Sequence, residues 1–186
     1  MDGKNSQPTH RDKAAMNGAQ IYLFAKLQTG GWIGEWATCL STDKGSVGRA
    51  FSRMDSIMNS PNSAFRDCSQ SAAEVAWGGS FIGKMDTGTM DQRLQSDHAS
   101  PDKAGAADAT SGDIVRYADS HNTPEHFASF VYTNDSGTPM VFSVSGQGGP
   151  KQVGAASDFE GAQAPGVNYG TIRGVNPGES GYYRPE

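Results

Sequence analysis

The sequence predicts an α+β fold, in which helices from the N-terminal half pack on an antiparallel sheet from the C-terminal half. Two patterns support this fold class. Apolar residues recur with helical spacing between residues 47 and 77, and with the period of two that is typical of strands between residues 114 and 144. Helices that precede a run of strands indicate an α+β order rather than an alternating α/β order. The length of 186 residues is that of one domain.

Two helices are predicted. The first covers residues 47–58, and the second is Cys68–Trp77. Asp67 suits the N-cap of the second helix and Gln70 its third helical position, which together form a capping-box pattern, and Gly78 ends it. The first helix is predicted from the apolar side chains that share one of its faces, namely Val47, Ala50, Phe51, Met54, Ile57 and Met58.

Three strands are predicted after the helices, at Ile114–Tyr117, Phe127–Tyr132 and Met140–Val144. Asn134–Gly137 predicts a hairpin turn between the last two strands. The tail beyond residue 146 is rich in glycine and proline, so we expect only short strands there, for example at Val167–Ile172.

Two further segments carry no regular period. Residues 1–18 are polar and predict a flexible arm, which leaves residues 19–186 as the single folded domain. Residues 96–112 consist mainly of small and polar residues and predict a mobile loop beside the functional cleft.

The charge balance excludes several classes of partner. The chain has 15 Lys and Arg against 20 Asp and Glu, a net charge of −5, which argues against a nucleic-acid-binding protein. No apolar run approaches the roughly 20 residues of a membrane helix, so no membrane insertion is expected. Met1–Met16 has no apolar segment typical of a signal peptide, so we expect synthesis in the cytoplasm and export only by a dedicated system.

The two cysteines, Cys39 and Cys68, exclude a multi-cysteine zinc site, and neither a metal nor a cofactor is expected. Cys68 is the candidate nucleophile, because the free N–H groups and positive dipole of a helix N-terminus favour a thiolate. The same N–H groups could stabilise an oxyanion. The alternative is a buried structural cysteine, and a disulfide with Cys39 remains possible. We interpret Cys39 as a packing residue.

A thiol nucleophile needs a base, and the chain has four histidines. His10 lies in the predicted arm and His98 in the predicted loop, where both would be solvated. His121 belongs to a turn, whereas His126 enters a predicted strand, which would hold its ring rigidly. His126 is therefore the candidate base.

A third residue would orient the imidazole of His126. If Thr133 and Thr138 flank the hairpin turn, His126 lies opposite Ser145, with Ser143 on the same face. Either hydroxyl could then accept the Nδ1 proton, whereas a shift of one residue would remove both from that face.

The remaining acidic residues fit no calcium-binding loop and are interpreted as solvated charges. They are Asp86, Asp91, Asp97, Asp102 and Asp108.

The order of three motifs resembles the NlpC-like, papain-type cysteine peptidases, which cut cell-wall peptides. Asp67–Ser69 (D-C-S) opens the second helix, Gly112–Ile114 (G-D-I) opens a strand, and His126–Phe130 opens the next. Val141–Ser143 matches the position that follows the base in that family. The ending Gly181–Pro185 also resembles papain-like toxin domains of Rhs-type and type VI secretion effectors.

The resemblance implies a papain-like, NlpC-type domain with its nucleophile helix packed on the antiparallel sheet. Cys68 would attack, His126 would act as base, and Ser143, with Ser145 as the alternative, would orient the base. The substrate would be an amide bond in peptidoglycan stem peptides. The implied partners are a secretion-system carrier, which would deliver the protein to the periplasm of a target cell, and a cognate immunity protein.

Two other functions fit the same residues. The first is a deamidase, transglutaminase or acyltransferase effector that acts on a protein or lipid of a target cell through the same thiol and imidazole. The second is a non-catalytic binding module, in which Cys68 and Cys39 belong to the core or form a disulfide.

Overall fold

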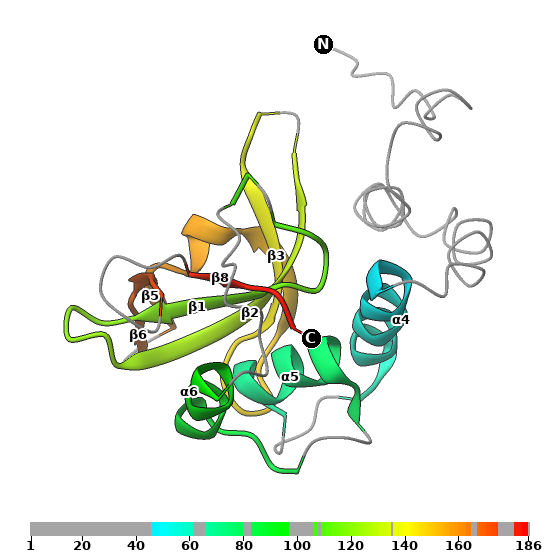
Figure 1. Cartoon of the computed structure of the whole chain (residues 1–186), viewed down its shortest axis with the longest axis horizontal. Helices are drawn as coiled ribbons and strands as arrows, with labels where there is room; N and C mark the ends of the chain where they lie inside the picture. The colour runs from blue at the N-terminus through cyan, green and yellow to red at the C-terminus, as the bar shows by residue number, and fades with distance from the viewer. Residues whose placement is uncertain are drawn as a thin grey trace.

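The computed structural model describes the protein in the ranges 46–61, 66–79, 83–96, 106–107, 109–134, 136–164, 167–174 and 181–185. Within these ranges helices precede strands, so the predicted α+β order is confirmed (Figure 1). The helices are α4 (Ser46–Asn59), α5 (Cys68–Trp77) and α6 (Thr87–Gln95). The predicted arm, Cys39, and residues 97–105 of the predicted loop lie outside the described ranges.

The strands are β1 (Ile114–Ala118), β2 (Pro124–Thr133), β3 (Pro139–Val144), β4 (Lys151–Ala155), β5 (Gly161–Ala164), β6 (Val167–Tyr169), β7 (Thr171–Ile172) and β8 (Tyr182–Tyr183), and the 3-10 helix η2 (Ala156–Phe159) follows β4. Antiparallel pairing gives the order β4-β3-β2-β1-β7, and β8 also pairs with β1. β5 and β6 form a separate two-stranded sheet.

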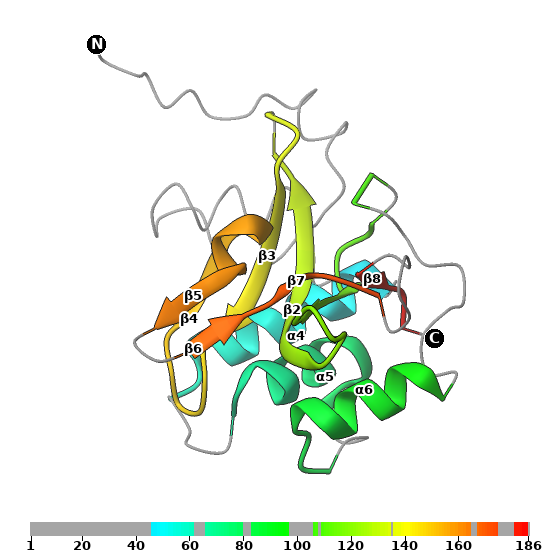
Figure 2. The same cartoon turned by 90° about the vertical axis from the view of Figure 1, so that its left-hand side faces the viewer.

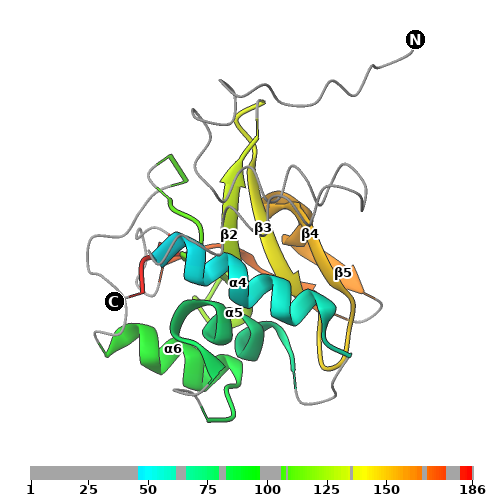
Figure 3. The same ribbon diagram turned by 90° about the vertical axis from the view of Figure 1, so that its right-hand side faces the viewer.

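The main sheet is covered on both faces. Helices α4, α5 and α6 lie against one side, which we call the helical face (Figure 3). On the other side, the aromatic face, η2 and β6 lie away from the helices (Figure 2). The aromatic face buries Val115, Tyr117, Ala128, Phe130, Val141, Ala156, Phe159, Tyr169 and Tyr182 in one cluster.

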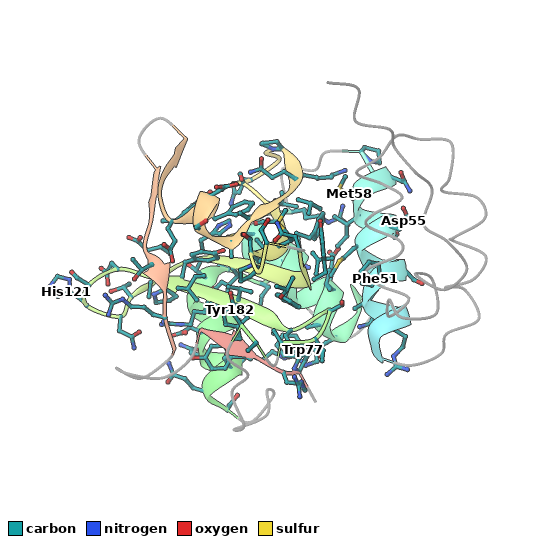
Figure 4. All side chains as sticks on the ribbon, turned by 90° about the horizontal axis from the view of Figure 1, so that it is seen from above. Phe51, Asp55, Met58, Trp77, His121 and Tyr182 are labelled. Carbon is teal, nitrogen blue, oxygen red and sulfur yellow. The ribbon has the colours of Figure 1, made fainter. Side chains whose placement is uncertain are left out.

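The apolar face predicted for the first helix is the face that α4 buries. Phe51 and Ile57 pack with Val131 of β2 and Phe142 of β3 on the helical face. Figure 4 shows α4 at the edge of the molecule, with Phe51 and Met58 along it. Burial of each such side chain contributes roughly 1.5–3 kcal/mol, so this contact fixes α4 on the sheet.

The predicted start and end of α5 are confirmed, but the capping box is only half formed. Asp67 accepts a hydrogen bond from the Gln70 N–H at 2.9 Å, and Gly78 ends the helix with φ of 85°. The Gln70 side chain does not return to the N-cap. It accepts from the Met85 N–H at 2.9 Å and donates to Glu74 at 3.2 Å, so it ties α5 to the segment before α6.

Helix α6 was not predicted. Asp86 caps it by accepting from the Thr89 N–H at 2.8 Å, and Leu94 is among its buried residues. The interpretation of Asp91 as a solvated charge is wrong, because Asp91 is buried and pairs with Arg116 of β1 at 2.5 Å. This ion pair joins residues that are distant in the chain, so local sequence patterns do not reveal it.

The three predicted strands are confirmed as β1, β2 and β3. Because β2 begins at Pro124, His126 lies inside the strand rather than at its first position. The predicted turn is also present: Asn134 accepts from the Thr138 N–H at 2.9 Å, and Gly137 has φ of 77°.

Candidate active site

Cys68 lies at the junction between α5 and β2. It is the first residue of the helix and is 6% exposed. The backbone N–H groups of Phe127 and Ser69 hydrogen bond with its sulfur, and the Ser69 hydroxyl lies 3.7 Å from Sγ. Donors therefore surround the one atom of this side chain that can act as a nucleophile.

The Cys68 sulfur contacts the backbone of Phe127 in the part of β2 that is no longer paired with β3. Among the described residues, the register partners of these strands begin at Ser129 and Phe142 and continue toward the turn. Nearer the start of β2, side chains meet the backbone of Phe127. Its N–H binds Cys68, and its carbonyl accepts from the Ser143 hydroxyl at 3.2 Å. Cys68 and Ser143 thus contact the same residue.

The predicted register of the hairpin is confirmed beside this site and lost nearer the turn. Ser129 faces Phe142 as that register requires, and the ladder shifts by one residue just beyond Phe130. Because the irregularity lies on the turn side, it leaves His126 and Ser143 on the same face of the sheet.

His126 is fully buried in the aromatic face. Its ring stacks on Tyr169, with centroids 3.9 Å apart and planes 17° apart, and on Phe159 at 5.7 Å and 12°. Tyr117 contributes a tilted contact at 5.4 Å. Three aromatic rings therefore hold the plane of the imidazole.

Ser143 binds the imidazole, but through the nitrogen that was not expected. Its Oγ lies 2.8 Å from Nε2 of His126, so the expectation that a serine would accept the Nδ1 proton is wrong. The Ser143 hydroxyl also lies 3.2 Å from the Phe127 carbonyl, which can only accept its one proton. We infer that the hydroxyl donates there and accepts from His126, which assigns the proton of the neutral ring to Nε2.

This tautomer leaves the lone pair on Nδ1. Among the described residues, Nδ1 of His126 is one of the few buried polar atoms without a hydrogen-bond partner. An unpaired buried acceptor is costly, and such atoms concentrate where chemistry needs them. Ser145, the alternative orienting residue, instead accepts from the Gln152 side chain at 2.8 Å.

Burial sets the resting protonation of both groups. Burial lowers the pKa of His126 to about 3, so the imidazole is neutral near pH 7. Burial also raises the pKa of Cys68 above its usual range, against the smaller lowering by the Phe127 N–H. Burial thus favours a neutral thiol over the expected thiolate in the resting protein.

His121, a histidine also weighed as the base, lies outside this site. Its side chain is 86% exposed at the turn between β1 and β2, and Figure 4 shows it projecting from the far end of that hairpin. Its contacts there are with Asp119 and Ser120. Of the two candidate bases, only His126 is enclosed.

The G-D pair of the sequence motif has a structural role. Gly112 has φ of 98°, and its N–H donates to the Phe130 carbonyl at 2.9 Å. The buried carboxylate of Asp113 accepts from the Thr110 N–H at 2.8 Å and pairs with Arg184 at 3.2 Å. These contacts fix the start of β1 and tie the C-terminal segment to it.

Sequence reasoning missed the aromatic residues that enclose His126. Phe159 belongs to η2 and Tyr169 to β6, in a tail that was expected to hold only short strands. The one local signal is Gly170, which follows Tyr169 and allows a close approach of the backbone.

Comparison with protein-family models, with curated proteins and with solved structures finds no match to this chain. Within the described ranges, no group of three or more His, Cys, Asp or Glu side chains is arranged to hold a metal ion. Over the same part of the chain, no helix has the length and apolar character needed to cross a membrane.

Proposed function

We propose that this protein is a thiol-dependent amide hydrolase with Cys68 as nucleophile and His126 as base. One observation carries the proposal. His126 is held through Nε2 by Ser143, its Nδ1 has no partner among the described residues, and the next residue, Phe127, has the N–H that binds the sulfur of Cys68. A structural histidine buried at this depth would be expected to use both ring nitrogens.

The proposed reaction starts from the neutral pair. Nδ1 of His126 takes the thiol proton as the sulfur of Cys68 attacks the carbonyl carbon of an amide. The N–H of Cys68 at the N-terminus of α5 stabilises the oxyanion, and the imidazolium then protonates the leaving amine, which gives a thioester. Water attacks the thioester, Nδ1 takes its proton, and Cys68 leaves as the thiol. Ser143 keeps the ring oriented throughout.

The proposed fold family and substrate depend on the motif resemblance. A helix that begins at a cysteine and packs on an antiparallel sheet carrying the histidine is the arrangement of a papain-like, NlpC-type domain. On that basis we propose peptidoglycan stem peptides as the substrate. An antibacterial effector role follows, with delivery by a secretion system and a cognate immunity protein.

A second candidate keeps the thiol and imidazole but changes the acceptor. Cys68 is nearly buried and both His126 and Ser143 are fully buried, so little water reaches the pair. Within this candidate, exclusion of water favours the transglutaminase and acyltransferase chemistries, which transfer the acyl group to an amine or hydroxyl. The deamidase chemistry is its third member and uses water as the acceptor.

The test uses purified muropeptides and mass spectrometry. We expect the wild-type protein to release peptide fragments, Cys68→Ala and His126→Ala to release none, and His121→Ala to match the wild type. Exported to the periplasm of a bacterial host, the wild-type and His121→Ala proteins should then lyse the cells, and Cys68→Ala and His126→Ala should not. Intact muropeptides with wild-type protein would reject this substrate, and products joined to an added amine would favour acyl transfer. Cleavage by Cys68→Ala would reject the thiol mechanism.

A further inference from the structure

Tyr169 makes the closest ring contact of His126, and no sequence motif marked it. The two rings are nearly parallel, with centroids 3.9 Å apart, and Tyr169 is itself buried. A face-to-face contact of this kind restricts rotation of the imidazole about its last side-chain bond. The contact therefore bears on the orientation of the base.

The backbone places Tyr169 there by a close approach to β1. A Cβ atom at the next residue, Gly170, would lie 1.7 Å from the Ala118 carbonyl oxygen, so only glycine fits. Directly afterward the chain pairs with β1, with Thr171 opposite Ala118. Since Tyr117 of β1 is the register partner of His126, this crossing brings Tyr169 over the imidazole.

The phenol end of Tyr169 lies within electrostatic reach of the Cys68 side chain. Burial raises the pKa of Tyr169, the charge of a Cys68 thiolate raises it further, and a hydrogen bond with the Ser145 side chain lowers it. Ser145 in turn is held by Gln152 at 2.8 Å. Ser143 of β3 and Ser145, which follows the strand, thus hold two different partners: Ser143 binds His126, and Ser145 binds the ring that lies over it.

We propose that Tyr169 is a positioning residue that holds the imidazole of His126 in its reactive plane and closes the site over Cys68. Cys68 is 6% exposed, so on this proposal the ring of Tyr169 moves aside before an acyl group enters. The closed state excludes water from the resting thiol. The positioning role depends on the proposed function, whereas the closing role does not.

The experiment measures two rates on the same variants: alkylation of Cys68 by iodoacetamide, and cleavage of muropeptides. Tyr169→Ala should raise the alkylation rate by roughly tenfold or more, because an opened, more hydrated thiol ionises more readily. It should lower kcat for cleavage with little change in KM, because the base is no longer oriented. Tyr169→Phe keeps the ring and should restore both rates to within about twofold.

Tyr182→Leu serves as the matched control, because Tyr182 belongs to the same buried cluster but makes its ring contact with Phe130. Its alkylation rate should equal that of the wild type; a rise matching that of Tyr169→Ala would show general loosening and overturn the proposal. Unchanged alkylation in a folded Tyr169→Ala would also overturn it. Should Tyr169→Ala fail to fold, Tyr169→Leu replaces it under the same criteria. Faster alkylation of Tyr169→Ala, combined with no cleavage of muropeptides by the wild-type protein, would reject the proposed hydrolase but support the closing role of Tyr169.

Discussion

The two faces of the β1–β2 pair each bury one basic side chain completely, and the two are treated in opposite ways. Arg116 on the helical face pairs with Asp91 at 2.5 Å and donates to Asn122 and to the Gly174 carbonyl. His126 on the aromatic face has, within the described part of the chain, Ser143 as its one hydrogen-bond partner. A buried charge that is paired and well hydrogen-bonded stabilises a fold, whereas a buried base with a free lone pair is poised for proton transfer.

The largest difference between the faces should appear in activity. Replacing His126 with Phe should lower turnover by about 10²–10⁴-fold, because the general base is lost. The free energy of unfolding should change by about 1 kcal/mol or less, because an apolar ring suits the aromatic face. Kinetic assays and urea denaturation of the same preparation measure both effects. Retained turnover in a folded His126→Phe protein would show that the buried base of the aromatic face has no role in activity.

The complementary change on the helical face should show the opposite result. Arg116→Met should lower the free energy of unfolding by about 3–5 kcal/mol, because Asp91 is left as an uncompensated buried charge. Turnover per folded molecule should stay near that of the wild type. The double variant Arg116→Met, Asp91→Leu should recover much of the stability in the same denaturation assay. No recovery would mean that the ion pair is not the source of the loss.

A smaller effect is expected at the orienting serine. Ser143→Ala should lower turnover by about 10- to 100-fold, because Nε2 loses its partner and the tautomer is no longer fixed. Ser129→Ala is the matched control, since its buried hydroxyl has no hydrogen-bond partner among the described residues. It should keep wild-type turnover and lose little stability. Equal activity of both variants would exclude an orienting role for Ser143.

The mildest difference concerns pH. The pKa of His126 is about 3 in the folded protein and near the ordinary 6.5 when unfolded, so its contribution to stability is complete above pH 6.5 and is lost as the pH falls toward 3. Each unit of difference between the folded and unfolded pKa corresponds to about 1.4 kcal/mol in the free energy of unfolding. Denaturation curves at pH 7 and pH 4.5 should show a smaller loss for His126→Phe than for the wild type, whereas exposed His121→Phe should lose as much as the wild type.

The sequence predicted the helical face better than the aromatic face, for a physical reason. Val47–Met58 and Cys68–Trp77 have a helical period, and the second helix also has caps at Asp67 and Gly78; these signals depend only on neighbouring residues. The hairpin turn and the register that places His126 beside Ser143 are also local. Asp91 with Arg116, and Tyr169 with His126, are contacts across long separations that no period reveals.

The protonation states of Cys68 and His126 were the other feature that could not be predicted from the sequence. The start of α5 correctly located Cys68, and a helix N-terminus does favour a thiolate. The degree of burial decides which protonation state prevails, and the burial of His126 depends on Phe159 of η2 and Tyr169 of β6, which stack on its ring. Without the tertiary structure, neither the neutral thiol nor the lowered pKa of His126 could be predicted.

Nitrogen NMR of the His126 ring in the native protein measures its tautomer and titration directly. We expect a proton on Nε2, an unprotonated Nδ1, and no change in either resonance between pH 8 and pH 5, as a neutral base held by Ser143 requires. A proton on Nδ1, or a titration near pH 6.5, would contradict the assignment of His126 as the base that faces Cys68.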